Sequence, residues 1–570
     1  MKRFIAVATV SLVTAMSLVG CSAGNAVVPN SHVTIAEVGA FTTLNADVTQ
    51  AGAKIADDFA ELAMQSFYEL DKNGNLVANE NFGTVEVTKQ EPFTVTYTLG
   101  KSAVWSDGSN LDATDLALAV IAAQKPDFKA SSSSTSLANA EIVGTPKIGQ
   151  KSLSLKFTQP ISDWKTALTV SVPAHVVGKA AGIGGNVSAV RAGIVDAIVG
   201  NQADVLAKLA AAYSDAFTPT APIDNFVTNG AYTVKSVSAE VVVLKAERDF
   251  AGERTPIAET VNLMSYPDNA AAFKAAGSGE ADVFLPRPSL AEPQSDLVSQ
   301  AGALGSKTVN LLAPSSNYAE QFVMNMGSGA FADTSYSDPS IGPALRSAFM
   351  ELVPKTRAID FASLTQTVTR ADSFVFSAGS KNYSAVTSSN GSTNYMIQDA
   401  EKASNLIAAL KLKTAPTVRV LFDTDDPAAV AEWTLLSDNA SDAGFKLRNI
   451  SSSDPSAHLA GGFYEVYLGA LPLLGVGTGS VQQLVTGPSR MPLELFNGLT
   501  AKVQSAGEKG LSAALSTLDK ALFDLGYGLP MYQLPTLVIA NKRISGFGAH
   551  PFGQNAGWGY WTWQVSADKS

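Results

Sequence analysis

Residues 93–116, FTVTYTLGKSAVWSDGSNLDATDL, place a strand, a turn and the start of a helix in direct succession. Apolar residues alternate with threonine from Phe93 to Leu99, which is typical of a strand with one buried face. Ser106-Asp107-Gly108 predicts a tight turn. Asp112 is placed to cap a helix through Leu118, because its carboxylate can accept hydrogen bonds from the amides of the first turn.

On both sides of this stretch, short β-rich runs alternate with helical segments, which predicts an α/β protein. We expect the first strand at His32 to Val38 and a long strand from Tyr232 to Leu244. A helix is predicted at Asn269 to Ala276, followed by a strand at Ala281 to Leu285. Residues 558–563 contain three of the six tryptophans and are expected to be core or packed surface.

The N-terminus predicts export. Lys2 and Arg3 precede an uncharged, mostly apolar run to Val19, which is typical of a secretory signal. The run is too short for a membrane-spanning helix, which would need ~20 apolar residues. The run ends in Leu-Val-Gly-Cys, which resembles the bacterial lipobox, so Cys21 is expected to be acylated and to anchor the chain on the extracytoplasmic face of the cell membrane. The alternative is an ordinary signal peptide whose cleavage site adjoins a cysteine.

Composition narrows the class of protein. Cys21 is the only cysteine, so a disulfide framework is excluded. The net charge of −11 becomes about −13 when the two basic residues of the signal leave, which disfavours nucleic acid as a partner. The four histidines, at 32, 175, 458 and 550, do not have zinc-site spacing, and we expect neither a metal nor a cofactor.

Further segments, taken with the opening stretch, resemble the dipeptide and oligopeptide-binding proteins, which form family 5 of the extracellular solute-binding proteins of ABC importers. The likeness lies in the order and spacing of short motifs across nearly the whole mature chain. Beyond residues 97–116, the matching segments are Phe67–Asp71, Gly74–Val77, Asn229–Tyr232, Gly279–Asp282, Phe322–Asn325, Ala344–Ala348 and Leu529–Gln533.

The resemblance implies a type II periplasmic-binding-protein fold, with two lobes, hinge strands and an extra subdomain in lobe I. We expect a signal peptide at 1–20 and a lipidated N-terminus and linker at 21–30. Lobe I is predicted at 31–264, with the extra subdomain at about 66–190, lobe II at 265–525, and a return to lobe I at 526–570. The crossings between lobes are predicted near 263–266 and 529–532.

The resemblance also implies a function: capture of a peptide or other small solute by hinge closure, and delivery to the permease subunits by a monomer that performs no chemistry. A sensing or adhesion lipoprotein without a transporter stays open. A remote alternative is a penicillin-binding-like serine acyl-enzyme, because Ser162-Asp163-Trp164-Lys165 and Ser437-Asp438-Asn439 spell two of its motifs. A Lys-Thr-Gly after Asn439 is absent from the sequence.

The ligand is less defined. Peptide-binding members hold the amino terminus of the peptide with an aspartate shortly after a strand resembling Phe463–Tyr467, but Leu468–Gly475 contains no acid. This run therefore predicts a blocked peptide, a hydrophobic solute or anchoring elsewhere, unless it is simply a buried strand and loop. The candidate pocket residues are placed at predicted strand ends and at the second crossing: Phe41, Arg287, Asn325, Tyr532 and Gln533. Arg287 could clamp a carboxylate.

Overall fold

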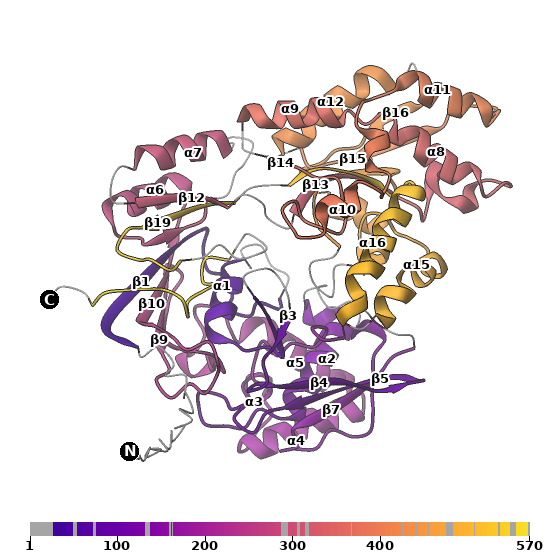
Figure 1. Ribbon diagram of the computed structural model, residues 1–570. Helices are drawn as coiled ribbons and strands as arrows, with labels where there is room; N and C mark the ends of the chain where they lie inside the picture. Colours follow the sequence, from indigo (N-terminus) through magenta and orange to yellow (C-terminus); the bar gives the residue numbers. More distant parts are fainter. Residues whose placement is uncertain are drawn as a thin grey trace, which may run out of the picture.

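β-Sheets form the framework of both halves of the molecule (Figure 1). The computed structural model describes residues 27–567, except 49–53, 72–75, 131–136, 159–160, 162–163, 287–293, 305–307, 314–317, 366–367, 425, 441–442, 454, 475–480, 482, 507, 534–535 and 548–554. The predicted signal peptide, Cys21 and Arg287 lie outside the described residues.

A seven-stranded sheet organises the first lobe, which we define as residues 27–313 and 536–567. β1 lies at its centre and runs parallel to both of its neighbours, whereas β8 and β9 form an antiparallel hairpin at one edge. Across the sheet the strands are β12 (Thr308–Ala313), β19 (Thr536–Asn541), β11 (Val283–Phe284), β1 (Val28–Val38), β10 (Ala258–Tyr266), β9 (Val241–Ala246) and β8 (Tyr232–Val237).

A six-stranded sheet organises the second lobe, residues 318–533. Across it the strands are β14 (Thr369–Arg370), β18 (Gly528–Gln533), β13 (Tyr318–Met324), β17 (Val466–Pro472), β15 (Thr417–Leu421) and β16 (Lys446–Asn449). The helices of this lobe are α8 (Ile341–Met350), α9 (Lys355–Thr365), α10 (Tyr383–Thr387), α11 (Ala400–Ala409), α12 (Pro427–Ala440), α13 (Ser456–Gly461), α14 (Gln483–Thr486), α15 (Leu493–Ser505) and α16 (Glu508–Asp524).

A four-stranded sheet lies within the region predicted as the extra subdomain, and a two-stranded ribbon precedes it. The four strands are β4 (Gly83–Gln90), β5 (Phe93–Leu99), β7 (Ser152–Lys156) and β6 (Glu141–Ile142), and the ribbon pairs β2 (Tyr68–Leu70) with β3 (Leu76–Ala78). The helices of the first lobe are α1 (Lys54–Ala63), α2 (Ala113–Gln124), α3 (Ala174–Ala180), α4 (Val187–Val199), α5 (Ala203–Asp215), α6 (Asn269–Ser278) and α7 (Gln294–Ala303).

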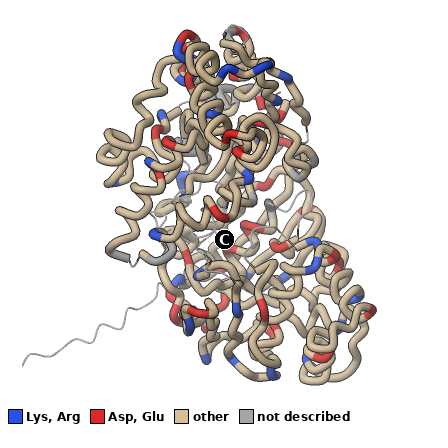
Figure 2. The backbone as a smooth tube through the Cα atoms, turned by 90° about the vertical axis from the view of Figure 1, so that its right-hand side faces the viewer, with Lys and Arg blue, Asp and Glu red and all other residues tan. Residues whose placement is uncertain are grey.

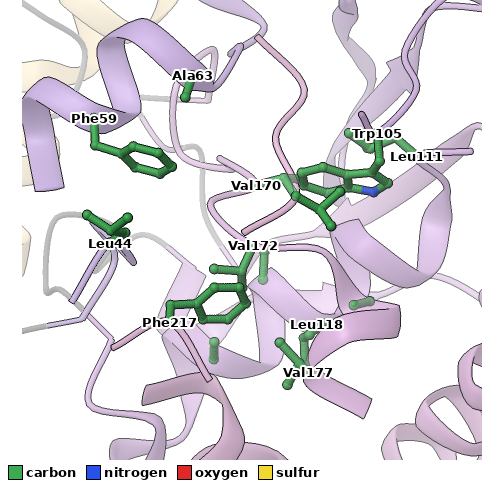
Figure 3. Close-up of a cluster of buried hydrophobic side chains, with 14 of the residues drawn as sticks. Leu44, Phe59, Ala63, Trp105, Leu111, Leu118, Val170, Val172, Val177 and Phe217 are labelled. Carbon is green, nitrogen blue, oxygen red and sulfur yellow. The ribbon is translucent and has the colours of Figure 1, made fainter. Parts of the chain in front are cut away.

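One continuous core joins the four-stranded sheet to β1, β8, β9 and β10 of the seven-stranded sheet, and a smaller cluster packs α6 and α7 against β1, β11 and β19. In Figure 3, Phe59 on α1, Leu44 from the loop after β1 and Phe217 lie in one part of this core, and Trp105, which follows β5, lies beside Val170 and Leu111 in another. The core of the second lobe is separate and draws on residues 322–532 alone. Each lobe therefore buries its own apolar surface and is stabilised independently.

The helix that begins after Asp112 confirms the predicted cap. The Asp112 carboxylate accepts a hydrogen bond from Thr114 N at 2.8 Å, and the Asp115 carboxylate accepts one from the Asp112 amide at 2.9 Å. In both bonds a backbone amide donates to a carboxylate, so the pairing satisfies two amides that the first helical turn leaves without partners. Both carboxylates also contact the buried Arg191 on α4, which the sequence did not indicate.

Two strand predictions need correction. The expected strand Tyr232–Leu244 is a hairpin, because Ser238 caps a turn by accepting hydrogen bonds from the amides of Glu240 and Val241. The expected strand after α6 contains only Val283–Phe284. The C-terminal aromatic segment is core, as predicted, with Trp563 only 1% exposed.

The chain passes between the lobes at two adjacent places. β12 ends at Ala313, which pairs with Thr536 at the start of β19. β13 then begins at Tyr318, and its second residue pairs with Gln533 at the end of β18. The described residues that flank the two passages are therefore neighbours on both sides, in one antiparallel pair of strands in each lobe.

The predicted crossings differ from these positions. Residues 263–266 lie inside β10, which stays in the first sheet because it pairs with both β1 and β9. The first sheet then also takes up β11 and β12, so the chain leaves it some fifty residues later than expected. Residues 529–532 lie inside β18 of the second sheet, just before the return.

Candidate ligand-binding site

Strand directions bring several strand ends to the two passages. In the second lobe β13 begins there, and its antiparallel partners β17 and β18 end there. In the first lobe β12 ends there. β11 and β12 both pair antiparallel with β19, so they run in the same direction, and β1 runs parallel to β11. Ligands of α/β sheets bind beyond the carboxyl ends of strands, so this junction is the candidate site.

Two predicted residues follow first-lobe strands that end toward the junction. Phe41 follows β1, but its ring is 3% exposed and packs in the first-lobe core. Arg287 follows β11 and lies outside the described residues. Phe41 thus contributes packing in this structure, and the role of Arg287 stays a prediction.

Two further predicted residues, Tyr532 and Gln533, end β18 beside the return passage and are fully buried. The Tyr532 hydroxyl donates to the Glu432 carboxylate on α12 at 2.9 Å. The Gln533 side-chain oxygen accepts from the Ala378 amide at 2.6 Å. These contacts fix β18 against the body of the second lobe, and a direct contact with a ligand stays a prediction for both residues.

Asn325 follows the last residue of β13, at the end of the second sheet's strands that is opposite to the passages. β13 starts at the junction and runs away from it, so the residue that follows its last position is far from the site. The Asn325 amide donates to the carbonyls of Gly462 and Tyr464 at 3.1 and 2.8 Å, and its oxygen accepts from Gly327 N at 2.9 Å. In this arrangement Asn325 holds a turn together, and strand direction explains why the expectation of a pocket role does not fit.

A buried acidic group lies close to the junction, which the sequence analysis missed. Glu320 on β13 is 1% exposed and is the cross-strand neighbour of Tyr532. Burial, reinforced by the charges of Asp426 and Glu432, holds the pKa of Glu320 well above its usual range. Burial likewise raises the pKa of Glu432 to about 8. The signal in the sequence was the acid itself, because Glu320 precedes the apolar residues Phe322 to Met324 in a strand whose positions after Tyr318 are all buried.

Two polar side chains at the junction remain accessible. Tyr318, the first residue of β13, is 36% exposed, and its pKa is raised by burial and by the charge of Asp57 on α1 of the first lobe. Arg370 on β14 pairs with Tyr532 through the backbone, and its side chain is 39% exposed. Its Nε atom lies 2.8 Å from Asp372, which also accepts from the buried Lys355. A guanidinium held in this way can bind a carboxylate of a ligand.

The run that replaces the expected aspartate is a buried strand over its first part. β17 pairs with β13 on one side and with β15 on the other. A side chain at Gly469 would lie 2.8 Å from the Tyr467 hydroxyl, so the tyrosine covers this position. The structure therefore agrees with the alternative of a buried strand, and the run leaves no carboxylate here for an ammonium group.

Other kinds of site receive little support from the described residues. Ser437, from the second serine-enzyme motif, lies in α12 and donates to the Thr434 carbonyl one turn earlier. Ser162 falls outside the described residues. Within the described part of the chain, neither a cluster of potential metal ligands nor a helix of the length and apolar character needed to cross a bilayer is found. Basic and acidic residues are interspersed over both lobes (Figure 2).

The model of the bacterial extracellular solute-binding proteins, family 5 middle, matches residues 86–470. This range is 385 of the 570 residues and includes parts of both lobes. The chain belongs to this family. The two-lobe α/β architecture and the resemblance in sequence motifs are thereby confirmed.

Curated relatives of this family 5 protein match over shorter ranges. A lipoprotein of Mycobacterium tuberculosis is 29% identical over 176 residues, which is 30% of this chain and 31% of that protein. A lipoprotein of Mycobacterium leprae is 27% identical over 253 residues, 43% of each chain. The matches thus span less than half the length of these relatives.

Solved structures share the whole fold. The periplasmic EDTA-binding protein EppA superposes with a TM-score of 0.68 at 19% identity, covering 95% of this chain and 98% of that chain. The oligopeptide-binding protein AppA of Bacillus subtilis, solved with a nonapeptide, gives a TM-score of 0.60 at 11% identity, covering 94% and 99%. At these identities the likeness establishes the fold and leaves the ligand open.

Proposed function

We propose that this protein is the extracytoplasmic substrate-binding lipoprotein of an ABC importer, which captures a peptide or another small solute by hinge closure. The observation that carries the proposal is that the chain passes twice between two separately packed cores, and that the strand ends flanking the two passages are paired in each lobe. Short connections of this kind let lobes rotate without repacking either core. A ligand that contacts both lobes binds the closed form better and so shifts the equilibrium toward it.

The closed, loaded form is what the permease subunits would recognise, and the solute would be released chemically unchanged. We infer a monomer that binds rather than catalyses, because the family consists of binding proteins and the junction offers contacts rather than an activated nucleophile. The passages suggest a first lobe that extends to residue 313 and resumes at 536, with the second lobe between them.

Anchoring through Cys21 is the second part of the proposal. The sequence motif supports it, and so do the names of the relatives, which are lipoproteins. Two acyl chains on one cysteine would hold the protein at the outer face of the membrane beside its transporter.

For the ligand we infer a carboxylate-bearing solute. Arg370 is accessible at the junction in the second lobe, and Arg287 follows β11 in the first lobe. The relatives in structure bind, by their titles, EDTA and a nonapeptide, both of which carry carboxylates. A free amino terminus would not be held on β17, where no acid is present.

Native mass spectrometry of the protein purified from its source tests this function directly. We expect a non-covalent adduct of small mass that is lost on denaturation and that rebinds unchanged. Recovery of a chemically altered compound would contradict a binding role. Covalent capture of a fluorescent β-lactam at Ser162 would instead support the serine-enzyme alternative.

A further inference from the structure

Two cations share one carboxylate beside β14, the edge strand that flanks the return passage in the second lobe. Thr369, the first residue of β14, pairs with Gln533, the last residue of β18. Lys355, the first residue of α9, donates from Nζ to Asp372 Oδ1 at 2.8 Å. Arg370 Nε lies 2.8 Å from Asp372 Oδ2, so Asp372 bridges the two cations.

The three charges of this cluster do not balance. The Lys355 side chain is fully enclosed, at 0% exposure, and protein groups alone meet its charge: the Asp372 carboxylate and the Ala371 carbonyl at 2.6 Å. Because the same carboxylate also serves Arg370, one positive charge is left over. A solute can reach this surplus only at Arg370, whose side chain is 39% exposed.

A further acid in this region is occupied by other donors. Asn390 donates to the Asp372 carbonyl and to Asp519 Oδ2, both at 2.8 Å, so Asp519 lies on the far side of Asn390. The other Asp519 oxygen accepts from the Phe374 amide at 2.8 Å. Among the described residues, Asp519 forms no ion pair with either cation of the cluster, and its own partners are uncharged.

The Arg370 guanidinium is held in place and still has donors to spare. Its Nε donates to Asp372, and its Nη2 contacts the Met396 sulfur, which is a weak acceptor. Within the described part of the chain, Nη1 has no hydrogen-bond partner. The backbone is fixed as well, because the Tyr383 hydroxyl accepts from the Asp372 amide at 2.7 Å and donates to the Arg370 carbonyl at 3.2 Å. A carboxylate could therefore displace the thioether and accept two parallel hydrogen bonds from the end of the guanidinium.

We propose that Lys355 and Asp372 are positioning residues for the captured solute: Asp372 holds the Arg370 guanidinium, and Lys355 supplies the positive charge that Asp372 would otherwise cancel. The site is then selective for a carboxylate over an uncharged group of the same shape. This inference deepens the proposed function and rests on it in one respect, that the solute binds at the junction.

Acetate is the probe, and acetamide is its uncharged counterpart of nearly the same shape. The ¹⁵Nε signal of Arg370, assigned through its loss in Arg370→Gln, is followed by NMR at constant ionic strength. We expect acetate to shift this signal saturably and acetamide to leave it in place. Lys355→Met should weaken acetate binding at least about tenfold, because Asp372 then neutralises Arg370. The signal of Arg248, whose side chain is 55% exposed, reports the non-specific effect of the salt.

Lys402→Met is the matched control, because Lys402 belongs to the same lobe and pairs with Glu351 at 2.6 Å. It should leave acetate binding as in the wild type. If Lys355→Met does not fold, Lys355→Gln serves instead, since its amide can still donate to Asp372 but carries no charge.

Two results would overturn the proposal: equal acetate affinity in the wild type and the Lys355 variant, or an acetate response at Arg370 no larger than at Arg248. Neither result depends on the natural solute or on hinge closure. The proposed function fails on a different observation, the absence of closure when solute is bound, so the two failures are distinguishable.

Discussion

The buried cation Arg191 offers the strongest test of how the first lobe is stabilised. Its guanidinium lies 2.9 Å from Asp112 and 3.4 Å from Asp115, and the side chains of both acids are fully buried. Removing one partner of such a group leaves uncompensated charge, which costs about 3–5 kcal/mol. Each carboxylate keeps backbone hydrogen bonds, Asp112 from Thr114 and Gly149 and Asp115 from Ala174, so we expect Arg191→Met to cost about 3 kcal/mol.

The cost should depend on pH. Burial raises the pKa of Asp115 to about 6, although the charge of Arg191 acts to lower it. Without Arg191 that pKa rises further, so the folded variant binds a proton that the unfolded chain releases. The stability of Arg191→Met should therefore fall as the pH rises from about 5 to about 8, more steeply than that of the wild type.

Urea unfolding followed by tryptophan fluorescence measures both effects. Arg248→Met is the control, because Arg248 pairs with Glu259 at 2.8 Å while its own side chain is 55% exposed. Exposed pairs contribute about 0–1 kcal/mol. If Arg191→Met lowers the free energy of unfolding no more than Arg248→Met does at about pH 7.5, the buried cation does not stabilise this helix as we infer.

Three further predictions concern packing and location. Asn325→Ala should lower the free energy of unfolding in urea by about 2–3 kcal/mol, because it removes four side-chain hydrogen bonds, and it should leave solute affinity unchanged. A loss of affinity without a loss of stability would support the predicted pocket role. Gly528→Ala should lower the free energy of unfolding by at least about 3 kcal/mol, since the new Cβ would lie 1.9 Å from the Phe322 carbonyl oxygen. Gly498→Ala is the control, because its Cβ would meet open space, and it should not destabilise the protein. Equal urea midpoints for the two variants would refute this. Cys21→Ser should move the protein from the membrane fraction to the medium, as judged by fractionation and blotting, and retention at the membrane would refute anchoring.

The sequence predicted local structure well where neighbouring residues determine it. The alternation in β5 and the cap at Asp112 depend on contacts within a few residues, and both are present. Arg191 could not be assigned to that cap, because 79 residues separate it from Asp112 and spacing carries no information about which helix packs there. The first crossing was predicted too early for the same reason: β12 joins the first sheet only by pairing with β19, more than two hundred residues later.

The candidate site, like the fold, could be predicted from the sequence only in part. Strand ends could be predicted, but the direction of β13 within its sheet could not. This direction places Asn325 at the end of the sheet away from the passages. Glu320 could have been noticed as an acid within a predicted strand, but its place beside Tyr532 depends on pairing between strands more than two hundred residues apart. Side chains that meet only in the folded chain need the tertiary structure.

Small-angle X-ray scattering, with and without the solute recovered by native mass spectrometry, tests the hinge most directly. A closed protein of this length should have a radius of gyration of about 24 Å. We predict that the free protein is measurably more extended and that a saturating amount of solute reduces the radius toward this value. Identical scattering profiles in the two states would contradict capture by closure of the lobes.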